Sequence, residues 1–260
     1  MIDKLFLVKL FGHSASFFHG DLSVIDRWFW VKNRLPITKD QETLIDIGCG
    51  NGAFTIGSAL RGYQALGLTW DNNSQIQAKK RAVICRADTA KFEIQDVRHL
   101  EDREDLFEKF NVAICLENIE HILDDRKLIK DIIRCLKPGG RLLLTAPYYY
   151  FNPPRDEDNG PFKNQMEGIR HVRRGYTPAM LEELCIDSNI MLEKVTYCSG
   201  FLSQKLTGLY TFLTLRINPL LAWLVVLPLR ILPLIFDKAI SKFFNWPTWS
   251  ICIEAYKPRF

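Results

Sequence analysis

The chain has 260 residues, and its 34 Lys and Arg residues against 30 Asp and Glu residues give a net charge of +4. This small, evenly spread excess gives no support for a nucleic-acid-binding protein. The 47% hydrophobic and 25% charged residues exclude a disordered chain, and the length suffices for one large α/β domain with an appendage.

Cysteine usage bears on compartment and on metal binding. The seven cysteines are scattered, odd in number, and form no Cys-x-x-Cys pair with zinc spacing. Most lie in apolar runs, where cysteine packs as a small hydrophobic residue. We therefore expect a cytoplasmic protein with no bound metal. The first residues lack the apolar core and cleavage site of a secretory signal.

Residues 1–42 contain two possible helices and predict an N-terminal helical cap. Next comes Thr43-Leu-Ile-Asp-Ile-Gly-Cys-Gly-Asn-Gly, followed by a helix-compatible run over residues 53–60. This pattern predicts a strand, a tight turn and a helix. Glycine has no Cβ and tolerates positive φ, so Gly48, Gly50 and Gly52 let backbone approach a ligand, and the helix N-terminus offers N–H donors. A tight turn without a ligand and a dinucleotide fingerprint remain alternatives here.

Beyond the turn, strands and helices alternate along the chain. Apolar runs predict strands at residues 64–70, 91–95, 112–115 and 141–145, with helices at residues 75–82 and 126–136. This order is typical of βαβ units and a mostly parallel sheet, whose ligands sit at the carboxyl ends of the strands. Four consecutive strand ends carry polar groups: Asp46; Thr69 and Asp71; Asp96; Glu117, Asn118, Glu120 and His121.

Three motifs resemble one family. Asp46-Ile-Gly-Cys-Gly-Asn-Gly resembles the first motif of class I S-adenosylmethionine-dependent methyltransferases. Gln95-Asp96-Val97 resembles their adenine-contacting motif, and Leu136-Lys-Pro-Gly-Gly is similar to their post-helix signature. The resemblance covers residues 40–150 and 176–198. It implies a Rossmann-like α/β fold: a seven-stranded, mostly parallel sheet with helices on both faces and an antiparallel last strand. A dinucleotide site would not account for Asp96 or the Lys-Pro-Gly-Gly run.

The resemblance also implies a site for S-adenosylmethionine. Asp46 and the glycines would hold its amino-acid end, and Asp96 would accept from the adenine amine. At the ribose position the sequence has Thr69 where an acid is usual, which is similar to fatty-acid cyclopropane synthases. Both Thr69 and Asp71 are therefore assigned to the ribose contact. Asp71 could instead cap a helix. The expected cofactor-binding residues are Asp46, Gly48, Cys49, Gly50, Asn51, Gly52, Thr69, Trp70, Asp71, Asp96, Val97, Leu116 and Glu117.

The acceptor side offers fewer signals. A general base is needed only if the acceptor must lose a proton, and His121 and His171 are the candidates, each with a structural role as its alternative. Residues expected to bind the acceptor are Tyr148, Tyr149, Arg170 and Tyr176. The tyrosines could instead simply pack, and Arg170 could merely be solvated.

The last two strands are separated by a long apolar segment. Thr177 and Pro178 open a helix reaching residue 188, and strands are expected at residues 191–197 and 250–256. We therefore predict a methyltransferase domain over 43–198 and 250–260, with an apolar helical insertion over 199–249. The insertion has three interpretations. The first is a transmembrane span, but the insertion's longest uncharged stretch, 217–229, is shorter than the ~18–20 residues of a transmembrane helix.

The second interpretation is an interfacial surface over 206–240, in which basic residues meet anionic lipid. Those residues are Lys205, Arg216, Arg230, Lys238 and Lys242. The third is a lid or a homodimer interface, because large apolar patches also mark protein contacts.

The sequence thus predicts a methyltransferase that modifies oxygen or carbon on a hydrophobic or lipid-linked acceptor, in the cytoplasm or peripherally on a membrane. One alternative is a soluble methyltransferase of small natural products or glycans that dimerises through the insertion. The other is an inactive methyltransferase fold that acts as a binding protein. No nucleic-acid partner is expected.

Overall fold

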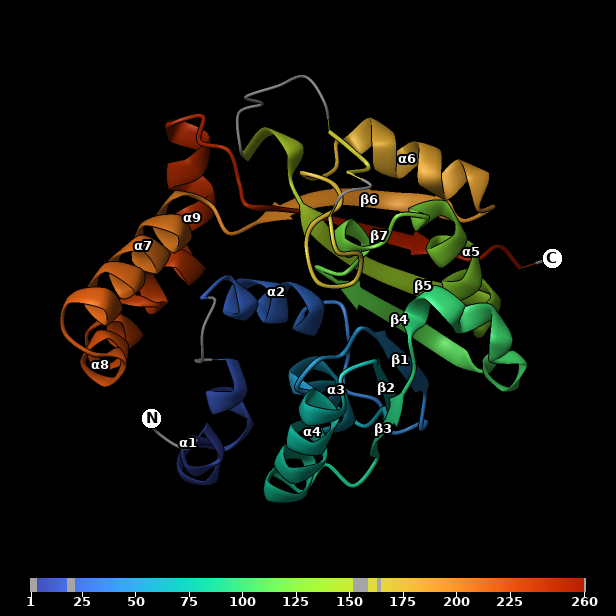
Figure 1. The fold of residues 1–260 in the computed structure, drawn as a ribbon, viewed down its shortest axis with the longest axis horizontal. Coiled ribbons are helices and arrows are strands. Elements are labelled where there is room, and N and C mark those ends of the chain that lie inside the picture. The colour runs from blue at the N-terminus through green and yellow to red at the C-terminus, as the bar shows by residue number, and fades with distance from the viewer. Residues whose placement is uncertain (1–3, 18–21, 152–158, 163–164, 260) are drawn as a thin grey trace.

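The computed structural model describes residues 4–17, 22–151, 159–162 and 165–259 (Figure 1). Within them, seven strands form one sheet in the order β3-β2-β1-β4-β5-β7-β6. Strands β1 to β5 pair in parallel, whereas β7 lies antiparallel between β5 and β6. The predicted fold class is confirmed. The strands are β1 Thr43–Ile47, β2 Gln64–Thr69, β3 Ala90–Ile94, β4 Phe110–Leu116, β5 Leu136–Pro147, β6 Met191–Cys198 and β7 Ser250–Tyr256.

Helices cover both faces of the sheet (Figure 1). Helices α5 and α6 contribute to one buried cluster, and α2, α3 and α4 contribute to the other. The α-helices are α1 Lys4–Phe11, α2 Ser23–Lys32, α3 Ala53–Ala59, α4 Asn72–Cys85, α5 Asp125–Cys135, α6 Pro178–Asp187, α7 Phe201–Arg216, α8 Pro219–Leu229 and α9 Ile231–Phe243. The 3-10 segments are η1 Gly12–Phe17, η2 Val97–Asp102, η3 Glu104–Leu106, η4 Ile119–His121 and η5 Tyr149–Phe151.

The Lys-Pro-Gly-Gly run differs from its prediction. We expected the helix to reach Leu136 and the strand to begin at Arg141, but α5 ends at Cys135 and β5 begins at Leu136. Leu136 pairs with Phe110, and the register then shifts before Arg141 pairs with Val112. Gly139 takes φ +79° inside the shift. The run is therefore an irregularity within the strand, which glycine's backbone freedom permits.

Helices α7, α8 and α9 form a group of their own beside α2, at the left of Figure 1. The chain leaves the sheet at Ser199 and returns at Trp249, whose N–H donates to the Ser199 carbonyl at 2.8 Å. The Asp237 carboxylate accepts the N–H groups of Gly200 and Leu202, each at 2.6 Å. These bonds hold the two ends of the helical group together next to the ends of β6 and β7.

Arg230 was predicted to belong to the basic surface that meets lipid, and this prediction is wrong. Its guanidinium is 4% exposed and pairs at 3.2 Å with Asp26 of α2, so it faces the protein and cannot meet a lipid headgroup. Among the described helices, none combines the length and the apolar character needed to cross a membrane.

Candidate active site

Three glycines shape the turn between β1 and α3, and the surroundings that a Cβ would meet differ from one to the next. Gly48, Gly50 and Gly52 take φ values of +78°, +50° and +75°. A Cβ on Gly48 would lie 2.7 Å from the Asn118 side chain, and one on Gly52 would lie 2.6 Å from the Phe92 ring. A Cβ on Gly50 would meet nothing within 4 Å. Gly50 therefore borders open space in which a ligand can approach the backbone.

Asp46 lies beneath this turn rather than on its open side. Its side chain is 3% exposed, and it accepts the Thr55 hydroxyl at 2.6 Å. Burial raises the pKa of the Asp46 carboxyl to about 7, and the bond from Thr55 opposes the rise. Asp46 therefore stabilises the turn through its hydrogen bond with Thr55.

The ends of β2 and β3 lie next to the turn. The Cys49 N–H donates to Leu68 at 2.8 Å, and the Gln95 N–H donates to Thr69 at 3.0 Å. Asp71 caps α4 by accepting the N–H groups of Asn73 and Ser74, which is the alternative role considered for it. Thr69 is buried, and its hydroxyl accepts the Asp71 N–H at 3.3 Å.

Asp96 is already engaged by a neighbour. The Arg98 guanidinium donates to both of its oxygens, and the Arg98 N–H donates to Oδ1 at 3.0 Å. These bonds hold the pKa of the Asp96 carboxyl below its usual range. The side chain is 30% exposed, so it still faces solvent at the rim. Arg98 also lies 3.6 Å from Glu167, in the segment that follows β5.

Glu117, at the end of β4, meets the N-terminal segment. Arg27 of α2 is buried, and its Nη1 lies 3.4 Å from Glu117 Oε2. Glu117 Oε1 is buried and has no hydrogen-bond partner among the described residues. Arg27 had no role in the prediction, because only the fold brings this helix to the rim.

The N-terminal segment also reaches the start of α3. His13 Nε2 lies 2.7 Å from the Ala53 carbonyl, and Phe17 stacks on Trp28 with ring centroids 4.9 Å apart. Trp28 in turn meets Phe54 edge-on at 6.0 Å. Residues 12–17 and α2 therefore pack against α3 on one side of the glycine turn.

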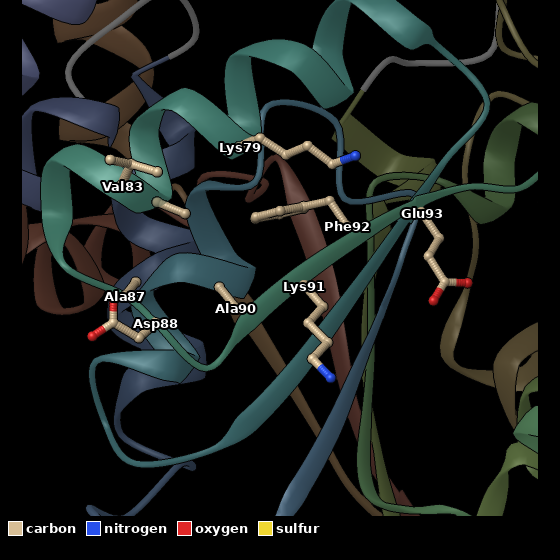
Figure 2. A pocket seen from close by; sticks show the side chains of 9 residues that line it. Lys79, Val83, Ala87, Asp88, Ala90, Lys91, Phe92 and Glu93 are labelled. Atoms are coloured by element: carbon tan, nitrogen blue, oxygen red, sulfur yellow. The ribbon is translucent and has the colours of Figure 1, made fainter.

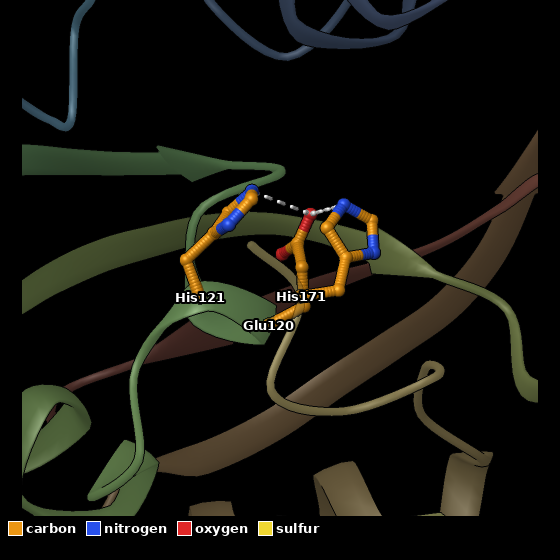
Figure 3. A group of neighbouring side chains, drawn as sticks. All are labelled: Glu120, His121 and His171. Atoms are coloured by element: carbon orange, nitrogen blue, oxygen red, sulfur yellow. Dashed lines mark ion pairs between the residues drawn. The ribbon is translucent and has the colours of Figure 1, made fainter. Parts of the chain in front are cut away.

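His121 and His171, the two base candidates, come together around Glu120 (Figure 3). Each Nε2 lies 3.9 Å from Glu120 Oε1, and the two rings are 4.6 Å apart. Backbone bonds hold the later segment in place, since Val172 N–H donates to the Glu120 carbonyl at 2.8 Å and Gly168 N–H donates to the His121 carbonyl at 2.9 Å. Burial lowers the pKa of both histidines, so both rings are neutral at pH 7.

Glu120 is a site residue that the sequence prediction left without a role. It is 1% exposed, whereas His171 is 52% exposed. Burial and, secondarily, the charge of Glu117 raise the pKa of the Glu120 carboxyl well above its usual range. A glutamate directly before a histidine at a strand end was the available signal, but the contribution of His171 depends on the fold.

The predicted acceptor residues divide into two groups. Tyr176 is a correction: it is fully buried, and its hydroxyl donates to Asp125 at 3.0 Å, so it supports the core rather than lining an open site. Tyr148 and Tyr149 belong to an aromatic cluster at the end of β5, and both meet Tyr150 edge-on. Arg170 is exposed in the segment that carries His171.

The remaining predicted cofactor residues also lie at the ends of their strands. Trp70 is 55% exposed, Val97 is buried, and Asn51 and Leu116 are half-buried.

A separate hollow of about 530 Å³ lies along α4 and the edge strand β3 (Figure 2). None of the predicted site residues lines it. It lies beside the sheet rather than at the carboxyl ends of the strands, where ligands of this architecture bind.

Comparison with known proteins agrees with this geometry. A family model described as "Methyltransferase domain" matches residues 25–189. Among curated proteins, ubiquinone biosynthesis O-methyltransferase of Pseudomonas putida is 26% identical over 117 residues, covering 45% of this chain and 48% of that protein. The chain spans about half the length of the curated relatives it matches.

Two solved structures share the fold. Phosphoethanolamine N-methyltransferase 2 of Haemonchus contortus, in complex with S-adenosyl-L-methionine, has a TM-score of 0.63 at 18% identity and covers 99% of this chain and 60% of that chain. The cyclase SpnF has a TM-score of 0.60 at 19% identity and covers 91% of this chain and 83% of that chain. These likenesses show the fold alone, and a cyclase among them illustrates that fold does not fix the reaction.

The resemblance inferred from the three sequence motifs is confirmed by the match across residues 25–189, which include the first five strands and α6. The chain belongs to the methyltransferase-domain family, and it shares its fold with a solved methyltransferase that binds S-adenosyl-L-methionine.

Proposed function

We propose that the protein transfers a methyl group from S-adenosylmethionine to a hydroxyl oxygen of a hydrophobic or lipid-linked acceptor. The observation that carries this proposal is the placement of two features on neighbouring strands. The open space beside Gly50 follows β1, and the pair of neutral histidines follows β4. Ile47 at the end of β1 is paired with Cys115 near the end of β4. A donor group and a proton acceptor can therefore meet at one rim.

The residues present fit the cofactor. Gly50 leaves room for its amino-acid end, and Glu117 offers a buried, unpartnered Oε1 beside Arg27. Thr69 and Asp96 lie at the next two strand ends, where the ribose and adenine would be held. When bound, the cofactor supplies a methyl group activated on a positively charged sulfur.

The histidines would act on the acceptor. A hydroxyl must lose its proton as it is methylated, and a neutral imidazole can take that proton. His171 is half exposed and His121 lies behind it, so the acceptor would reach this pair from solvent. Oxygen is favoured as the methylated atom by the name of the curated relatives, which are O-methyltransferases.

A hydrophobic acceptor is favoured by the surface of α7, α8 and α9. We call this the apolar helical surface. Its only acidic residue, Asp237, is buried, whereas four of its cations are exposed. An apolar surface with only positive exposed charge suits an anionic membrane. The exposed apolar residues are Phe212, Leu215, Ile217, Leu221, Leu224, Val225, Ile231, Leu232, Leu234, Ile235, Phe236, Phe243 and Phe244.

The substitution Gly50→Asn tests the cofactor site. Asparagine tolerates the left-handed backbone better than other side chains, and a side chain here would extend into the space assigned to the cofactor. We expect calorimetry with S-adenosylmethionine and its demethylated product to show binding to the wild type and at least about 10-fold weaker binding to the variant.

Gly168→Asn is the matched control, because Gly168 also has positive φ and open space around its missing Cβ. It should bind the cofactor as the wild type does. A folded wild type that binds neither compound would refute the proposed function.

A further inference from the structure

Glu120, His121 and His171 converge more closely than a catalytic base requires. Their carboxylate and ring atoms lie within 4.8 Å of one another, and Glu120 Oε1 lies between the two Nε2 atoms (Figure 3). Ligands of a tetrahedral ion, with bonds of about 2.0–2.2 Å, lie roughly 3.4 Å apart. The observed 3.9 Å separations exceed this by about half an ångström. Small shifts of both rings toward Glu120 would close these gaps, and neither ring is fully buried, since His171 is 52% exposed and His121 is 22% exposed.

The buried carboxylate is balanced only in part, because the charge of Arg27 acts on it but Arg27 also pairs with Glu117. Glu120 is 1% exposed, and its Oε2 has no hydrogen-bond partner among the described residues. The nearby Glu117 places a second acidic group beside it. A buried acid in such surroundings is costly unless it is protonated or bound to a cation.

We propose that Glu120 Oε1, His121 Nε2 and His171 Nε2 bind one divalent transition-metal ion of the zinc class. Two imidazoles and one carboxylate favour such an ion over magnesium, which prefers oxygen ligands. Three protein ligands leave at least one coordination position open. That position faces solvent on the His171 side. The sequence analysis expected no metal because it considered only cysteine spacing, and the approach of His171 to the Glu120–His121 pair depends on the fold.

The role of the ion rests on the proposed function. An acceptor hydroxyl in the open position would lose its proton to water more readily, because the ion stabilises the negative oxygen. The oxygen would then form its bond to the methyl carbon as the carbon–sulfur bond breaks, leaving a neutral thioether and the methylated acceptor. In this arrangement the histidines hold the ion and water replaces them as the proton acceptor, while the methyl donor and the methylated oxygen remain those of the proposed function.

The test uses full-length, untagged protein freed of metal by a chelator. Calorimetry with Zn²⁺ should give one site per chain, and Co²⁺ should produce the visible absorption of a site with nitrogen and oxygen ligands. His171→Gln, on an exposed side chain, should weaken Zn²⁺ binding by at least about 10-fold. Glu120→Gln, of equal size, should do the same. His99→Gln is the control, since His99 lies in η2 outside the cluster, and it should bind as the wild type does.

Absence of Zn²⁺ binding by the wild type, or equal affinity in the wild type and His171→Gln, would overturn the metal site. Cofactor calorimetry on the same samples separates the two proposals. Cofactor binding without metal uptake refutes the ion alone, and metal uptake without cofactor binding refutes the proposed function alone.

Discussion

Asp46 links the glycine turn to the stability of the fold. In the folded chain its carboxyl has a pKa of about 7 because it is buried, whereas an unfolded aspartate ionises near pH 4. Between these values the folded state holds a proton that the unfolded state has lost, so stability falls as the pH rises. Asp46→Asn removes this effect and keeps an acceptor for Thr55.

The variant should therefore gain about 3 kcal/mol of unfolding free energy relative to the wild type between pH 5 and pH 8. Urea unfolding at the two pH values measures this difference. Asp102→Asn, at an exposed residue, is the control and should follow the wild type. If Asp46→Asn also follows the wild type, Asp46 is not held in its neutral form.

Single residues were predictable from the sequence where the cause is local. The turn at Gly48, Gly50 and Gly52 requires positive φ, which glycine signals directly. The pairing of Arg27 with Glu117 was not predictable, because the two are far apart in the chain. Tyr176 was misassigned for the same reason, since only the fold shows that its hydroxyl is enclosed with Asp125.

Among the helices, α2 and the apolar helical surface depend on one buried ion pair. Arg230 is 4% exposed and pairs with Asp26, which also accepts the Ser199 hydroxyl at 2.8 Å. Asp26→Asn would leave a buried guanidinium without its counter-charge, at a cost of about 3–5 kcal/mol. We expect faster amide exchange in residues 201–243 and little change in β1 to β5, measured by hydrogen-exchange mass spectrometry.

Glu183→Gln provides the comparison for this ion pair. Glu183 pairs with Arg126 in solvent, so its loss should cost about 0–1 kcal/mol. An even loss of protection across the sheet in Asp26→Asn would show that the ion pair supports the whole fold rather than these helices.

Helix starts were predictable because their caps are local. Thr177 accepts the Met180 N–H at 3.2 Å, and Pro178 follows it at the first helical position. The start of β5 was not predictable, because Pro and two glycines ordinarily mark a loop. Pairing of Leu136 with Phe110 keeps the run within the sheet.

Exposed charge on the whole molecule is distributed unevenly, since the apolar helical surface exposes basic residues and buries its acidic one. If this surface binds an anionic membrane, reversing Lys238 and Lys242 to Glu should lower partitioning by about 30-fold or more, since each cation contributes about 1 kcal/mol. Co-sedimentation with phosphatidylglycerol vesicles, compared with phosphatidylcholine vesicles, measures the effect. Reversal of the exposed Lys79 and Lys91, beside the β3 hollow, is the control and should have a smaller effect.

A different outcome would favour protein contact. A wild type that ignores both vesicles and elutes as a dimer, with Phe243→Glu restoring the monomer, would assign the apolar helical surface to a second copy of the chain.

The hydrogen bond between Ser199 and Trp249 has a consequence for how this protein could change. The segment over residues 199–249 begins and ends at one point, at the tips of two adjoining antiparallel strands. A short hairpin turn could bridge that point without altering the strand register. The methyltransferase-domain sheet and its attachment can therefore vary independently, and related chains could exchange this module to suit a different surface while retaining the same sheet.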